Sequence, residues 1–205
     1  MVVKSFETVR RVVFGYGSIE NLADEIKRVK GTKVLVVTDP GIQAAGLVAI
    51  ANSEFSNNRG LIISNGVTTY FGYGLQVVAG ETITLDAVTA SNNRLFGAHL
   101  QAGSDVTVAN STFDSQSSGS ATDLTGRGLE VIAGGTVTLS NVSVSNNQLF
   151  GANIQATGQN VFLNNVTANN NGTDGVQVAA LCALVTDGSY SGNGQYGLNL
   201  GTTAL

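Results

Sequence analysis

The acid/base chemistry that this sequence offers centres on one histidine and one glutamate. His99 is the only histidine of the chain, and Glu130 stands at an equivalent place in a later segment of similar sequence. An imidazole and a carboxylate held within hydrogen-bond reach form a general acid/base pair. His99 and Glu130 are therefore the candidate catalytic residues, provided that the fold stacks their segments side by side.

Both residues also belong to a set of polar positions inside short alternating segments, such as Leu75-Gln-Val. In a strand, successive side chains point to opposite faces, so the polar residue faces outward when its apolar neighbours face the core. Stacked segments would form a polar stripe able to bind sugar hydroxyls, although a solvated face without a ligand is the alternative. The stripe comprises Gln76, His99, Glu130, Asn153, Gln177 and Asn199.

These segments are copies of a repeat. Residues 74–96 align without gaps to residues 128–150, with 14 of 23 positions identical. The conserved positions are mostly apolar or glycine, while polar positions drift. No single unit of about 22 residues could bury its apolar side alone, but stacking at the strand spacing of about 4.8 Å builds one core. The pattern predicts a mainly β fold, a parallel β-helix of about seven coils over residues 47–205.

The coil boundaries are marked by glycines. Coils are expected to begin near Gly46, Gly60, Gly175 and Gly197, besides those of the two aligned copies. Residues 60–73 form a short coil in this interpretation, and residues 115–127 form a protruding polar loop. Loops of this kind on a solenoid often carry function.

Asparagine recurs at one place in successive units, at Asn52, Asn110, Asn141 and Asn165. Asparagine tolerates the left-handed backbone of a tight turn, and its amide can bond to the amides above and below it. The last three also fit the N-glycosylation pattern. We favour a buried ladder of amides over glycosylation sites.

Aromatic residues precede several coil-starting glycines. Tyr73, Phe96, Phe150 and Tyr196 occupy this position, where stacking within the fold is favoured over a platform for sugars.

Cys182 is the only cysteine, so no disulfide within the chain can form, and we expect it in the core.

Residues 1–46 differ from the repeats. They carry seven of the ten Lys and Arg and have a net charge of +2, whereas the remainder has a net charge of −6. Their apolar spacing predicts a strand over residues 12–14, a helix after Ser18 that ends at Gly31, and a strand over residues 34–38. We predict that this strand-helix-strand segment caps the N-terminal end of the solenoid.

Two runs of this segment resemble the opening of the iron-containing (group III) alcohol dehydrogenases. They are Arg11-Val-Val-Phe-Gly-Tyr-Gly-Ser-Ile-Glu-Asn-Leu and Lys33-Val-Leu-Val-Val-Thr-Asp-Pro-Gly-Ile, and the resemblance covers residues 1–47. It implies a truncated dinucleotide-binding unit in which Asp39 lies near the adenosine ribose of the cofactor. The metal site of that family, one Asp and three His, cannot be formed by a chain with one His. We therefore predict no bound cofactor and no metal.

Residues 48–205 resemble the right-handed parallel β-helices of pectate lyases and bacterial surface proteins. That resemblance implies a right-handed coil and polysaccharide as a partner. The calcium-binding Asp cluster and the Arg or Lys base of the lyases, and the Asp pairs of the polygalacturonases, have no counterpart here. Three hypotheses stay open: a non-catalytic scaffold or binding module, a carbohydrate-active lyase or hydrolase, and an engineered or accidental fusion without an evolved function.

Charge and hydropathy indicate which other kinds of partner to expect. The repeats hold three Arg and no Lys, so no basic patch for nucleic acid is expected. No apolar run reaches the length of a membrane span, and the first residues lack the features of a secretory signal, which leaves the compartment open. The last coil, residues 197–205, has no evident cap, and we expect end-to-end self-association through it.

Overall fold

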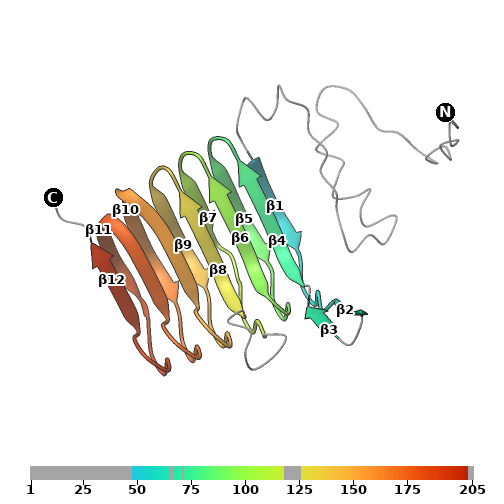
Figure 1. Ribbon diagram of the computed structural model, residues 1–205. Helices are drawn as coiled ribbons and strands as arrows, with labels where there is room; N and C mark the ends of the chain where they lie inside the picture. Colours follow the sequence, from blue (N-terminus) through green and yellow to red (C-terminus); the bar gives the residue numbers. More distant parts are fainter. Residues whose placement is uncertain (1–47, 65–66, 71, 118–125, 203–205) are drawn as a thin grey trace, which may run out of the picture. The chain divides into compact units, whose positions relative to one another are not determined.

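The computed structural model describes residues 48–64, 67–70, 72–117 and 126–202 (Figure 1). The expected cap over residues 1–46 and the candidate Asp39 lie outside these described residues. The described part is a stack of short parallel strands joined by tight turns, so the predicted mainly β solenoid is confirmed.

The strands form two rows, each a ladder of parallel pairs. The first strand row contains β4 (Tyr73–Ala79), β6 (Phe96–Ala102), β8 (Arg127–Ala133), the first part of β10 (Ala152–Thr167), the first part of β11 (Val176–Ser189) and β12 (Leu198–Thr202). The second strand row contains β1 (Val48–Glu54), β5 (Ile83–Thr89), β7 (Val106–Ala109), β9 (Val137–Ser143) and the later parts of β10 and β11. Because β10 and β11 run through both rows, they join them into one sheet.

The core lies between the rows and consists of columns of equivalent apolar residues. Ile83, Val106, Val137 and Val161 are register partners in consecutive strands and are fully buried. Alternation along each strand puts every second residue on the inner side, as the sequence predicted. The buried columns continue from coil to coil, so each coil covers the apolar side of the next.

One predicted coil is wrong. Residues after Gly60 do not start a solenoid coil but form an antiparallel hairpin, β2 (Leu61–Ser64) with β3 (Val67–Tyr70), which is a separate two-stranded sheet. The hairpin is an insertion between the turn after β1 and the beginning of β4 (Figure 1). Fourteen residues are too few for a coil of about 22, and an antiparallel hairpin is the shortest way to pair their backbone groups.

The predicted asparagine positions do turn the chain with left-handed backbone. The φ angles are 50° at Asn52, 49° at Asn110, 55° at Asn141 and 53° at Asn165. Nδ2 of Asn165 donates to Oδ1 of Asn141 at 3.0 Å, and Nδ2 of Asn141 donates to Oδ1 of Asn110 at 3.1 Å. The four side chains are exposed, however, so the expectation of a buried ladder is corrected. Asn52 is also separated from the other three, because Ala87 occupies the same column between Asn52 and Asn110. This surface ladder sits at an outer corner of the coil, where the left-handed turn points the amides to solvent.

A second, buried ladder occupies the next turn, and the sequence analysis missed it. Each member after the first, Asn58, accepts a backbone hydrogen bond from the preceding coil, for example Asn93 Oδ1 from Asn58 N and Gln116 Oε1 from Asn93 N, both bonds being 2.9 Å or shorter. The sequence predicts that Gln116 lies in the protruding loop, whereas it is almost fully buried. The buried ladder comprises Asn58, Asn93, Gln116, Asn147, Asn171 and Asn193.

Asp114 stands beside the buried ladder in a column of hydrogen-bond acceptors. Its carboxylate accepts from Ser145 N at 2.6 Å and from Ser143 Oγ at 2.9 Å. Burial raises the pKa of Asp114 above its usual value of 3.8, and it outweighs these hydrogen bonds, which lower it. In a later coil the neutral amide of Asn169 is the equivalent acceptor, because its Oδ1 accepts from Ser191 N at 2.7 Å.

We therefore expect Asp114→Asn to stabilise the protein at pH 7. A carboxyl group whose folded pKa is raised contributes most to stability when protonated, below about pH 3.8, and this contribution is lost as pH rises through the folded pKa. The neutral amide keeps the acceptor and avoids burying a charge. Thermal unfolding followed by circular dichroism should give a higher midpoint for the variant at pH 7 and equal midpoints near pH 3. A lower midpoint at pH 7 would contradict this reasoning.

Cys182 is a further correction, because its side chain is exposed rather than in the core. Cys182 follows the corner between the two halves of β11 and pairs in register with the exposed Asn160. The apolar character of a lone cysteine does not reveal which side of a strand it occupies after such a corner.

Candidate functional site

The candidate site lies on the outer side of the first strand row. Parallel pairing aligns the predicted stripe residues one above the other, for example Gln76 opposite His99 and His99 opposite Glu130. The same register continues to the last described strand. The complete order of the polar stripe is Gln76, His99, Glu130, Asn153, Gln177 and Asn199.

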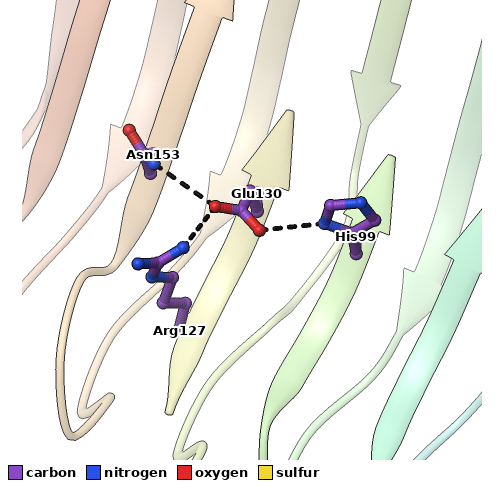
Figure 2. Close-up of polar contacts among 4 residues, drawn as sticks. All are labelled: His99, Arg127, Glu130 and Asn153. Carbon is purple, nitrogen blue, oxygen red and sulfur yellow. Dashed lines mark hydrogen bonds and ion pairs between the residues drawn. The ribbon is translucent and has the colours of Figure 1, made fainter. Parts of the chain in front are cut away.

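The two candidate catalytic residues meet at the middle of this stripe (Figure 2). His99 Nδ1 lies 2.9 Å from Glu130 Oε2, and Asn153 Nδ2 donates to Glu130 Oε1 at 3.4 Å. Arg127 Nη1 donates to the same Oε1. The Glu130 side chain is 10% exposed and the His99 side chain 19% exposed, so the carboxylate is the more enclosed partner.

Arg127 is the residue of this site that sequence reasoning missed. The sequence predicts that it ends a polar loop, but it is the first residue of β8 and pairs in register with Phe96. Its guanidinium carbon lies 5.6 Å from the ring centroids of both Phe96 and Phe150, one on each side. A signal was available: Arg127 stands directly before a coil-starting glycine, where four other copies carry an aromatic residue and one carries Asp174.

The aromatic residues before the glycines form a column next to the polar stripe. Tyr73 and Phe96 stack with centroids 5.1 Å apart and an interplanar angle of 13°. The Phe96 ring also meets the edge of the His99 ring at 5.8 Å. Phe96 is buried, but Tyr73 is 40% exposed and Tyr196 is 60% exposed. This column therefore fixes His99 from one side and leaves two tyrosines accessible to a ligand.

The contacts limit the chemistry of the Glu130 carboxylate. One oxygen is engaged by Arg127 and Asn153, and the other by His99, so the group neutralises Arg127 and orients the imidazole. A carboxylate enclosed by its own partners is poorly placed to take a proton from a ligand. The ring nitrogen Nε2 of His99 is the part of this pair that is left to face a ligand, since among the described residues only Glu130 forms a hydrogen bond with the ring.

The stripe has a second fixed point near its end. Asp174 is almost fully buried and accepts from Asn199 Nδ2 at 2.8 Å.

In residues 48–64, 67–70, 72–117 and 126–202 no group of three or more His, Cys, Asp or Glu could hold a metal ion. Over the same ranges, no helix is long and apolar enough to cross a membrane.

Comparisons with known proteins agree with this architecture. The model of the family described as right handed beta helix region matches residues 40–204. The chain is also 45% identical over 40 residues to the sulfoacetaldehyde reductase of Bilophila wadsworthia (strain 3_1_6), a match that covers 20% of this chain and 10% of the reductase. No solved structure matches the chain. Because the family model covers most of its residues, the chain belongs to the right-handed β-helix family.

Proposed function

We propose that the protein is a non-catalytic β-helix module that binds an extended polysaccharide along the polar stripe. The observation that carries this proposal is the unbroken register of six polar side chains, from Gln76 to Asn199, on one outer face. A linear polymer meets equivalent groups on a periodic surface, so a repeated scaffold suits it better than a compact small molecule.

The chemistry of the stripe supports a polyhydroxylated ligand. Four of its six members are amides, which offer both donors and acceptors to hydroxyl groups. The charge of Glu130 is offset by Arg127 within the site, so the surface does not favour a highly charged polymer. The exposed Tyr73 lies beside the first stripe residue, and its ring can cover an apolar sugar face.

A glycan-array screen with the purified chain tests the proposal, followed by affinity measurements on each hit. Gln76→Ala and Gln177→Ala remove one amide group each, and we expect the double variant to bind about tenfold more weakly or worse, since one net hydrogen bond contributes about 1 kcal/mol. Gln159→Ala is the matched control, because Gln159 is exposed but lies outside the stripe. Equal loss in the control, or absence of any hit, would refute the stripe as a binding surface.

A carbohydrate-active lyase or hydrolase is the second candidate, favoured by the 2.9 Å contact between His99 and Glu130. In this alternative His99 acts as the base and Glu130 orients it. Each glycan hit should be assayed for cleavage. Activity that is lost in both His99→Ala and Glu130→Gln would establish the enzyme, and activity unchanged in both would remove this pair from the mechanism.

Residues 1–47 receive a proposal of their own: a fragment related to the iron-containing alcohol dehydrogenases, joined to the β-helix in a natural, accidental or engineered fusion. The 40-residue similarity to a reductase supports it. The chain covers a tenth of that reductase, so we propose no dehydrogenase activity. A nicotinamide cofactor titration, which should show no binding, tests this point.

A further inference from the structure

The two ends of the described solenoid expose core columns that interior coils bury completely. Val161 and Leu163 in β10 are buried, but their register partners Ala183 and Val185 in β11 are only partly covered. At the other end of the second strand row, Val48 and Ile50 of β1 are likewise only partly covered, although their register partners in β5 are fully buried. The partly buried apolar residues at the two ends are Val48, Ile50, Phe55, Ala183, Val185, Tyr190 and Leu198.

The ends also have complementary steps. At the C-terminal end the first strand row extends one strand further than the second, because β12 pairs with β11 and, among the described strands, with no other. At the N-terminal end the second row extends one strand further, because β1 pairs with β5 while β4 ends the first row. Among the described strands each step is therefore one strand high.

We propose that copies of this chain associate head to tail, with β12 pairing with β4 of the next copy and the second half of β11 pairing with its β1. One copy then fills both steps at once, with every strand parallel and in the register of the interior coils. Such a joint does not close on itself, so it produces linear assemblies.

The apolar columns continue across this joint. In the interior register, Leu198 and Leu200 of β12 fall opposite Leu75 and Val77 of β4 in the next copy. Leu200 is 42% exposed in the single chain and would be covered. The exposed Tyr196 would meet the exposed Tyr73, in the column where Tyr73 already stacks on Phe96.

Both asparagine ladders continue as well. In the surface ladder the upper residue donates Nδ2 to the residue below, as Asn165 does to Asn141. Asp187 has the left-handed backbone of the same column, with φ of 58°, and falls below Asn52 of the next copy, so its carboxylate is the acceptor for Asn52. A charge-assisted bond of this kind is stronger than the amide pairs inside the chain.

The buried ladder ends in a matching donor and acceptor. Asn171 N donates to Asn193 Oδ1 at 2.9 Å, and the next step would be Asn193 N to Asn58 Oδ1 of the following copy. In the first coil, Asn58 N donates to Asn93 Oδ1 at 2.9 Å. Asn58 could therefore accept from Asn193 of one copy through its side chain and donate to Asn93 of its own copy through its backbone. The joint reproduces the bond that every interior turn makes.

Among the described residues, the edge strands carry few of the devices that prevent pairing. Natural proteins protect a free strand edge with Lys, Pro or inward charges. β1, β4, β11 and β12 contain no Lys and no Pro, and their charged residues are Glu54 and Asp187. Asp187 has a partner at the joint, and Glu54 falls opposite Ser189, which carries no charge.

The test is assembly of the full chain, measured by light scattering after size exclusion, by sedimentation over a wide concentration range and by electron microscopy. We expect masses that rise in steps of one chain with concentration, and unbranched rods. Leu200→Lys should leave single chains, because it places an ammonium group in the core column of the joint. Gln155→Lys adds the same charge on the outer face of an interior coil and should assemble like the parent.

A reciprocal pair of variants distinguishes this joint from other contacts. Asn52→Asp opposes two carboxylates and should weaken assembly roughly tenfold, while combination with Asp187→Asn should restore it. Circular dichroism at low concentration checks that each variant folds. Single chains at every concentration, or a dimer that does not grow, would overturn the proposal; the first is what a cap formed by residues 1–46 predicts. Assembly of Leu200→Lys equal to the parent would also overturn it.

Discussion

Gly151→Ala is expected to destabilise the solenoid by about 3 kcal/mol or more. A Cβ at this position would lie 2.3 Å from the carbonyl oxygen of Gly175 and 2.5 Å from that of Val144. Both are backbone atoms of a hydrogen-bonded stack, so they cannot rotate away as a flexible side chain would. The third neighbour is Nδ2 of Asn171, 2.7 Å away, which belongs to the buried ladder. The substitution therefore disturbs two coils and the ladder together.

Gly201→Ala is the control for this prediction. A Cβ there would have Val178 O as its nearest neighbour, at 3.4 Å, which is ordinary contact. Chemical denaturation should show a large drop in the free energy of unfolding for the variant at Gly151 and a change within about 0.5 kcal/mol for the control. Similar values for both would mean that the tight backbone contacts around Gly151 do not require a glycine at that position.

Phe113→Ala is expected to cost about 3 to 5 kcal/mol, which is the usual range for deleting a buried aromatic ring. Phe113 is fully buried and has the largest side chain among the fully buried residues described. Its backbone hydrogen bonds place it in one column with the buried Ala90 and Val144 of the adjoining coils. These smaller neighbours cannot extend into the cavity, because the strand register fixes their backbone.

The matched control is Phe162→Ala, which makes the same change on the outer side of β10, where Phe162 is 37% exposed. We expect a loss below about 1 kcal/mol for this variant. Because coils contact only their neighbours, the Phe113 variant should also lose amide protection in its own coil and the next before the remote coils open. Hydrogen exchange that weakens evenly along the whole chain would contradict this view of the solenoid.

The prediction for Gly151 depends on a structural relation that recurs in the repeat. In five coils the coil-starting glycine packs against the ladder amide of its own coil: for example, a Cβ on Gly128 would lie 2.6 Å from Nδ2 of Asn147, and one on Gly74 would lie 2.5 Å from Nδ2 of Asn93. The missing side chain makes room for the buried amide. Glycine and asparagine are thus required together, at about the same spacing in each coil.

Sequence alone determined the solenoid and the order of the polar stripe. Gly74 and Gly128 begin two copies whose apolar positions coincide, and a period of two within each strand decides which side chains face inward. Parallel stacking then aligns equivalent residues, so the neighbourhood of His99 and Glu130 followed from the alignment of the copies. Asparagine also marked the left-handed turns, because few other residues adopt that backbone without strain.

Only the tertiary structure decided which asparagines are buried. Asn141 and Asn147 belong to the same coil and the same residue type, yet one faces solvent and the other lies in the core, because the corner between them reverses the direction of the side chains. Arg127 joined the site because an insertion before it left its strand in register between Phe96 and Phe150. Local sequence specifies the turns and the alternation within strands, but the path of the complete coil decides whether the side chains at each turn are buried or exposed.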